Sequence, residues 1–158
     1  MRGVTMVEPG RVEVVDIDDP SPGPDEVIVS VAALGICGTD IHILEGDYGR
    51  LPIVPGHEFA GQVVEVGSNV RKVRTGDLVA ADPNIPCTTC YQCRRGRLNL
   101  CENLNAIGVT VPGAAAEFVR VPAGNCVLLP DGTKAADAAL IEPLLRGKRF
   151  RCHPCEAG

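Results

Sequence analysis

The chain has 158 residues, a length typical of one domain, and carries a formal net charge of −5 at pH 7. The acidic balance and the lack of a basic face exclude a general nucleic-acid binder. No stretch approaches the ~20 apolar residues of a membrane span, and the first residues lack the apolar run of a signal peptide. We therefore expect a cytoplasmic protein with neither a nucleic-acid nor a membrane partner.

Short β-rich segments separated by turns are predicted for the first half of the chain. Partly alternating β-branched residues predict strands over residues 12–17 and 26–32, joined by a rigid proline-rich loop. Thr39 is expected to cap a short helix that runs to about Leu44. Further strands are expected over residues 61–66 and 78–80. Tyr48 and Phe59 are candidates either for a substrate pocket or for the core.

The second half contains two more predicted strands, over residues 116–121 and 125–129. Cys126 lies in the second of them and is expected to be a buried small hydrophobe. A helix is expected through residues 135–140, capped by Asp131 or Thr133. Many short strands with regular turns favour an irregular barrel or sandwich with a few small helices.

Residues 83–105 have little periodicity and contain four closely spaced cysteines. The pattern is Cys87-x2-Cys90-x2-Cys93-x7-Cys101. Four thiolates at this spacing can surround one Zn²⁺ ion tetrahedrally and leave no position open, which is typical of a structural site. Three arginines in the same loop, at positions 94, 95 and 97, could offset the negative charge. The alternatives are unligated thiols and an iron–sulfur cluster, although the last spacing does not fit a ferredoxin.

A second set of metal-binding side chains surrounds the sequence Gly56-His57-Glu58. With Cys37 upstream and Glu142 downstream, it offers a thiolate, an imidazole and two carboxylates. That set suits a zinc ion that keeps a position open for substrate or water. The simpler interpretations are a buried structural cysteine, a salt bridge for Glu58 and a solvated helix end for Glu142.

The pattern Gly-His-Glu-x2-Gly-x5-Gly-x2-Val over residues 56–70 resembles the zinc signature of the medium-chain alcohol and polyol dehydrogenases. Residues 37–42, Cys-Gly-Thr-Asp-Ile-His, resemble the first catalytic motif of that family. The cysteine lobe, with Arg-Arg-Gly and Asn-Leu-Cys-Glu-Asn, is similar to its structural-zinc lobe. The sequence Glu142-Pro143-Leu144 is similar to the Glu-Pro-Leu of sorbitol and threonine dehydrogenase-like members.

This resemblance implies a mainly β, GroES-like irregular barrel over residues 1–143, with a structural-zinc lobe at residues 83–105. It implies two zinc ions, one catalytic and one structural. The catalytic ion would be bound by Cys37, His57, Glu58 and Glu142, and the structural ion by the four lobe cysteines.

The resemblance also implies the roles of three further side chains. Thr39 would hydrogen-bond the substrate hydroxyl, His42 would pass a proton to solvent, and Asp40 would orient His57. The substrate would be a small alcohol or polyol whose hydride passes to NAD or NADP. Two glutamates in place of a second cysteine lean toward polyols.

No Rossmann domain is expected in this chain, because no two glycines are separated by a single residue, as Gly-x-Gly-x-x-Gly requires. We therefore expect the nucleotide site to be absent and the chain to be inactive alone. The expected partners are a separate nucleotide-binding half or a second copy of the chain. The alternative is a non-catalytic zinc-binding interaction module.

Residues 144–158 have a different character. They carry four basic residues and one acidic residue, whereas the preceding residues are strongly acidic. The sequence thus predicts a frameshifted or truncated reading frame at this end. The alternative is a redox or metal motif formed by Cys152-His153-Pro154-Cys155.

Overall fold

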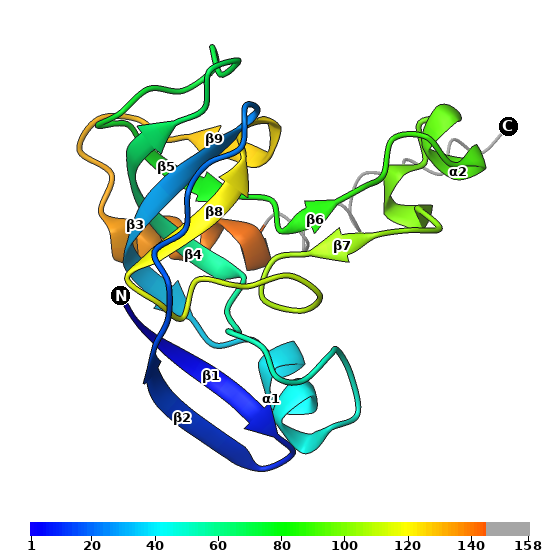
Figure 1. The fold of residues 1–158 in the computed structure, drawn as a ribbon. Helices are drawn as coiled ribbons and strands as arrows, with labels where there is room; N and C mark the ends of the chain where they lie inside the picture. Colours follow the sequence, from blue (N-terminus) through cyan, green and yellow to red (C-terminus); the bar gives the residue numbers. More distant parts are fainter. Residues whose placement is uncertain (145–158) are drawn as a thin grey trace, which may run out of the picture.

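The computed structural model describes residues 1–144, which fold into antiparallel sheets with a few short helices (Figure 1). The strands are β1 (Arg2–Glu8), β2 (Arg11–Asp16), β3 (Glu26–Gly35), β4 (Glu58–Val66), β5 (Leu78–Ala81), β6 (Asn84–Ile85), β7 (Asn105–Ala106), β8 (Phe118–Pro122) and β9 (Cys126–Leu128). The helices are α1 (Gly38–Glu45), α2 (Tyr91–Arg94) and α3 (Ala135–Ala139), with single 3₁₀ turns at Leu98–Leu100 and Ala123–Asn125. Residues 141–144 are also helical. The prediction of a mainly β fold is confirmed.

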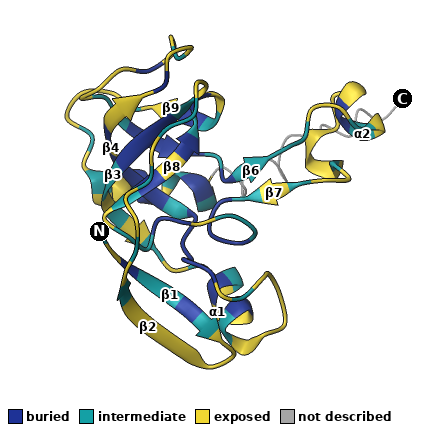
Figure 2. Cartoon of the chain, viewed as in Figure 1, coloured by how far each residue is buried: buried dark blue, intermediate teal, exposed yellow. Residues whose placement is uncertain are grey.

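The central sheet has the strand order β8-β3-β4-β5-β9, and each neighbouring pair is antiparallel. Successive residues of β3 point to opposite faces, yet Val27, Ile28 and Val29 are all buried. Both faces of this strand are therefore covered. Helix α3 packs against β3 and β4, and Figure 2 shows the buried residues gathered in these strands.

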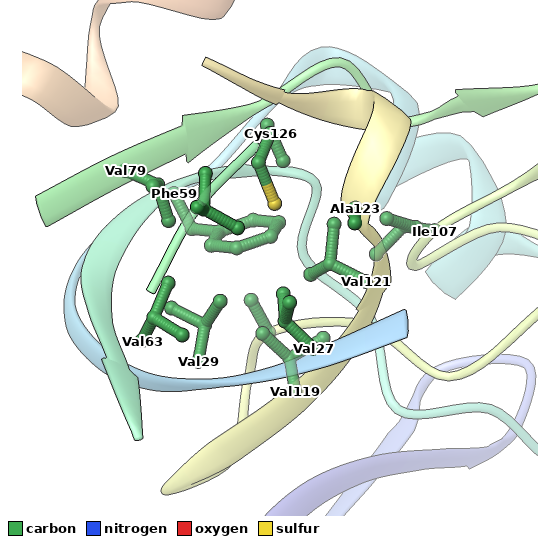
Figure 3. Packing of buried hydrophobic residues seen from close by; sticks show 13 residues of the cluster. Val27, Val29, Phe59, Val63, Val79, Ile107, Val119, Val121, Ala123 and Cys126 are labelled. Carbon is green, nitrogen blue, oxygen red and sulfur yellow. The ribbon is translucent and has the colours of Figure 1, made fainter. Parts of the chain in front are cut away.

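The main core lies between the curled strands and is built mostly from valine (Figure 3). Phe59 is only 1% exposed, and its ring lies among the side chains of Val63, Val79 and Cys126. Phe59 is thus a core residue. Tyr48, the other candidate for a pocket, is 58% exposed.

The hairpin of β1 and β2 stands at one end of the molecule beside α1 (Figure 1). A smaller buried cluster of Met6, Ile43, Ile53 and Val109 joins β1 to α1 and the loops that follow. The sequence analysis missed β1. The edge of β1 that does not pair with β2 forms isolated β-bridges with Ile53 and Ala116. Both residues are distant from β1 in the chain, so the local sequence did not indicate this pairing.

Both predicted helix caps were wrong. Helix α1 begins after Cys37 instead of Thr39, and the Asp40 side chain accepts a hydrogen bond from the backbone N–H of Cys37. Helix α3 begins after Lys134, without a side-chain cap. The Thr133 hydroxyl donates to the carbonyl of Pro130 instead.

Strands β6 and β7 leave the central sheet as a narrow ribbon and carry α2 at its tip (Figure 1). Only Cys93 is buried among residues 84–105. Among residues 1–144, no helix is both long enough and apolar enough to cross a membrane. The predictions for the basic tail, including Cys152 and Cys155, lie outside the described residues.

Candidate functional site

Cys37, His57 and Glu58 meet where β3 and β4 end their pairing. Gly35, the last residue of β3, pairs with Glu58, the first residue of β4. Cys37 follows two residues later and His57 immediately precedes Glu58, so the antiparallel pairing brings them together. One ligand atom from each of the three side chains lies within 4.8 Å of those of the other two. A thiolate, an imidazole and a carboxylate are ligands that catalytic zinc sites use.

The imidazole of His57 is buried, with 5% of the residue exposed, and its Nδ1 atom has no hydrogen-bond partner. This atom lies 3.6 Å from Oδ1 of Asp40. A buried polar atom without a partner is costly. Metal-binding histidines usually direct their other ring N–H at a carboxylate. A metal ion at Nε2 would leave the proton on Nδ1, facing Asp40, so these residues fit a bound zinc ion.

Asp40 also connects the two segments that carry the cluster. It is 4% exposed. Its Oδ2 accepts a hydrogen bond from the Cys37 N–H at 2.8 Å, and its Oδ1 accepts one from the Gly56 N–H at 3.3 Å. The carboxylate thereby holds the start of α1 against the residue before His57.

The structure places Thr39 and His42 differently with respect to the cluster. The Cys37 thiol donates to Oγ1 of Thr39 at 3.7 Å, so this hydroxyl lies beside the cluster. His42 is in the last turn of α1, with 63% of its side chain exposed, and its Nδ1 is 3.6 Å from Oε2 of Glu45. The sequence analysis did not single out Glu45, although the (i, i+3) spacing was available as a signal. The predicted roles of Thr39 and His42 stay predictions.

Glu142 is buried, with 9% of the residue exposed, in the helical segment 141–144. Burial does not fit the simpler interpretation of a solvated glutamate. Glu142 is not part of the group whose ligand atoms lie within 4.8 Å of one another. Its role as a zinc ligand stays a prediction.

The four lobe cysteines form the second metal-binding group. Ligand atoms of Cys87, Cys90, Cys93 and Cys101 all lie within 4.8 Å of one another, and none of these cysteines forms a disulfide. Backbone N–H groups point at the sulfurs: the Cys87 N–H donates to Sγ of Cys101 at 3.2 Å, and the Cys93 N–H to Sγ of Cys90 at 3.5 Å. This arrangement can hold a zinc ion with four sulfur ligands.

The environment within the lobe separates the acidities of its thiols. Hydrogen bonds from the backbone of Thr89 and Cys90 lower the pKa of Cys87 from 9.0 to about 6. The backbone of Glu102 and of Cys93 likewise lowers the pKa of Cys90. Burial raises the pKa of Cys93 to about 12. The thiolate form, which metal ions bind, is thus favoured at Cys87 and Cys90 before any metal binds.

Residues 23–131 match the model of the family described as the alcohol dehydrogenase GroES-like domain. The chain belongs to this family. L-threonine 3-dehydrogenase of Pyrococcus horikoshii is 41% identical over 150 residues, which cover 91% of this chain and 43% of that protein. The GroES-like fold expected from the sequence is therefore confirmed.

Solved structures of dehydrogenases have the same fold. Galactitol-1-phosphate dehydrogenase from Escherichia coli superposes with a TM-score of 0.89 at 35% identity, covering 94% of this chain and 43% of that one. A candidate zinc-binding dehydrogenase from Sinorhizobium meliloti 1021, bound to NADP, also has a TM-score of 0.89. It is 42% identical and covers 94% of this chain and 45% of its own. The chain spans about two fifths of the length of the relatives it matches.

Proposed function

We propose that this GroES-like domain is the metal-binding catalytic part of a zinc-dependent, NAD(P)-linked alcohol or polyol dehydrogenase. The observation that carries this proposal is that Cys37 and Glu58 lie close to His57, whose side chain is buried. A domain that used zinc only for structure would need nothing beyond the lobe cysteines. When bound at the three-residue cluster, a zinc ion would supply Lewis-acid chemistry and would lower the pKa of a substrate hydroxyl there.

The side chains of this chain divide the remaining tasks. Cys37, His57 and Glu58 would hold the ion, and Glu142 is proposed as a further carboxylate ligand. Asp40 keeps the His57 ring in place from behind. Thr39, beside Cys37, hydrogen-bonds the substrate hydroxyl and orients the substrate, so that the carbon bearing this hydroxyl can release its hydride.

The proton is proposed to leave along the exposed side of α1, the helix that carries both Thr39 and His42. A hydroxyl that loses its proton to Thr39 needs a path to water, and His42 lies on that helix with most of its side chain in solvent. An imidazole titrates near neutral pH and can transfer a proton in either direction.

The substrate class is proposed from the ligand chemistry and from the relatives. The two candidate carboxylate ligands, Glu58 and Glu142, lean toward polyols, and one similar structure is named for galactitol 1-phosphate. Nicotinamide is proposed as the hydride acceptor, since a similar structure holds NADP. A dinucleotide-binding domain is needed for that step.

The rival function is a non-catalytic zinc-binding module that acts through the lobe. Its support is that the four cysteines lie close enough for one ion without help from the rest of the chain. The two functions differ in the number of metal ions expected. The rival needs one zinc ion, whereas the catalytic proposal needs two.

The first test is the zinc content of the purified chain. Wild type is expected to hold two zinc ions and Cys37→Ser one. The control is Cys126→Ala, which changes a buried cysteine of the core and is expected to keep two. One zinc ion in both wild type and Cys37→Ser would favour the structural module.

Turnover is tested in a chimera. Residues 1–143 replace the matching part of the Pyrococcus horikoshii enzyme, and NAD or NADP reduction is followed with a panel of alcohols and polyols. Turnover that disappears with Cys37→Ser supports the proposal. A folded chimera with two zinc ions and no turnover on any alcohol would refute it.

A further inference from the structure

The cross-strand neighbour of Glu58 is a glycine. Gly35 and Glu58 are the terminal pair of the β3–β4 ladder. Residues paired across antiparallel strands project their side chains from the same face of the sheet. A side chain at position 35 would therefore compete with Glu58 for one space. That space adjoins the metal-binding cluster, because Cys37 follows Gly35 by two residues.

The crowding at this position comes from one residue. A Cβ atom added to Gly35 would lie 2.7 Å from Oε2 of Glu58 and 3.2 Å from its Cβ. Ordinary non-bonded contacts of carbon are 3.5–4.0 Å. The backbone of Gly35 is outside the left-handed region, so its conformation is open to any residue. What the glycine provides is room for the Glu58 carboxylate.

We propose that Gly35 is a positioning residue of the Cys37–His57–Glu58 cluster, because the Glu58 carboxylate occupies the space that a side chain at position 35 would fill. This inference rests on the proposed function in one respect, that the cluster binds a metal ion. The missing side chain keeps the carboxylate oxygen beside the Cys37 sulfur and the His57 ring. Any larger residue turns that oxygen away.

We expect Gly35→Ala to move the Glu58 carboxylate and to leave the fold intact. Oε2 is the far end of a flexible side chain, so Glu58 can rotate away from a new methyl group at little cost. Alanine in place of glycine at a strand end also removes conformational freedom from the unfolded chain. The Gly35→Ala protein should therefore fold and bind metal more weakly at this cluster. The ligands around the bound metal should also be arranged differently. The lobe cysteines should be unaffected.

The test compares four variants loaded with Zn²⁺ and, separately, with Co²⁺, whose visible absorption reports its ligands and geometry. The variants are Gly35→Ala, Glu58→Ala, the double variant and Gly38→Ala. Gly38 is the matched control, since it adjoins Cys37 on the other side and an added Cβ would meet nothing within 4 Å. Zinc affinity of the cluster is measured by competition with a chelator, and the lobe provides an internal reference.

Gly35→Ala is expected to weaken zinc binding at the cluster roughly 10–100-fold, as changes behind a metal ligand do, and to shift the Co²⁺ absorption. Gly38→Ala should match wild type. In the Glu58→Ala background, adding Gly35→Ala should change neither quantity, because the displaced carboxylate is already gone. That loss of effect distinguishes positioning through Glu58 from a general disturbance of the strand.

Three results would overturn the inference. The first is a Gly35→Ala protein with wild-type affinity and absorption. The second is an equal loss of affinity on adding Gly35→Ala in the presence and absence of Glu58. The third is failure of both Gly35→Ala and the double variant to fold; a double variant that folds where Gly35→Ala does not would support it. A wild-type chain without metal at the cluster refutes the proposed function as well.

Discussion

The Oδ1 atom of Asp40 lies 3.6 Å from Nδ1 of His57, and each of these two side chains is only 6% exposed. The same carboxylate accepts hydrogen bonds from the backbone of Cys37 and Gly56. One buried side chain therefore contacts every segment that supplies the metal cluster. This arrangement predicts that folding and metal binding both depend on Asp40.

Asp40→Ala is expected to lower the free energy of unfolding by about 3 kcal/mol, because the buried N–H of Gly56 and the partly buried N–H of Cys37 lose their acceptor. Zinc affinity at the cluster should fall roughly 10–100-fold, because His57 loses its support. Urea denaturation and chelator competition measure the two effects. Asp47→Ala is the control, since it removes an exposed acid just beyond α1. Equal behaviour of the two variants would contradict the role given to Asp40.

The signature glycine Gly61 is required by close packing of two strands. A Cβ atom there would lie 2.1 Å from the backbone carbonyl oxygen of Ser30 on β3. Backbone cannot rotate away as a side chain can, so β3 and β4 would have to separate. Gly61→Ala is expected to cost about 3 kcal/mol of the free energy of unfolding. Gly124→Ala, with nothing within 4 Å of an added Cβ, should be neutral, and urea denaturation of both variants checks this.

Phe59 lies directly after Glu58 and serves the core, not the metal cluster. It is 1% exposed among the valines of the central sheet (Figure 3). Phe59→Ala should lower the free energy of unfolding by about 3–5 kcal/mol, because it leaves a large cavity. Tyr48→Ala, at a 58% exposed position, should change it by at most about 0.5 kcal/mol. A loss of zinc from Phe59→Ala while the protein remains folded would count against this assignment.

Local signals in the sequence were sufficient for the lobe and for most strands. The four lobe cysteines lie within 15 residues of one another, so their spacing alone predicted that they meet. Cys37 and His57 are 20 positions apart, so their ligand chemistry alone was a weak signal that they meet, and the family resemblance strengthened it. In the structure their meeting follows from the β3–β4 register that pairs Gly35 with Glu58. A register of this kind is fixed by the whole sheet and cannot be derived from either segment alone.

The features that the sequence analysis missed depend on contacts between distant segments or on competition between neighbours. Strand β1 needs Ile53 and Ala116 at its second edge. At α1, Thr39 has the better capping propensity, yet Asp40 reaches back to the Cys37 N–H and starts the helix two residues earlier. The role inferred for Gly35 depends on where one carboxylate lies, which composition and spacing do not contain.

In metal-free protein, the lobe thiols should differ sharply in reactivity. The pKa of Cys87 is lowered from 9.0 to about 6 by backbone hydrogen bonds, so its alkylation rate should rise through pH 6 and level off below pH 8. Burial raises the pKa of Cys93 to about 12 and that of Cys126 to about 11, so these should react last. Iodoacetamide labelling across pH, read by peptide mass spectrometry, measures the order. Labelling of Cys93 before Cys87 would contradict it.

The lowered pKa of Cys87 also predicts how the stability of the metal-free chain changes with pH. The folded pKa of Cys87 lies below its ordinary value of 9.0, so the folded state favours the thiolate. The contribution of Cys87 to the free energy of unfolding is therefore fully present above pH 9 and is lost as the pH falls toward 6. Comparison of urea denaturation at these pH values in wild type and Cys87→Ser isolates it. The pH dependence should be smaller in the variant.

Removal of zinc should open the lobe and spare the central sheet. Among residues 84–105 only Cys93 is buried, so a metal ion would be the main link holding this segment together, and small metal-bound segments unfold without their ion. Arg94, Arg95 and Arg97 are exposed there and are substrates for trypsin once the lobe loosens. Chelator treatment is expected to make them the first sites cut, while the valine-rich core keeps the sheet folded.

Limited proteolysis followed by mass spectrometry checks this order, and two variants identify the metal responsible. Cys90→Ser should be cut in the lobe even with zinc present, because one of four thiolates is missing. Cys37→Ser should stay protected there, because its cluster lies at the end of β3, outside the ribbon of β6 and β7. Equal cleavage of the lobe with and without zinc would mean that the ribbon is held by its own strand pairing. Cleavage of Cys37→Ser at the same arginines would mean that the two metal centres are coupled.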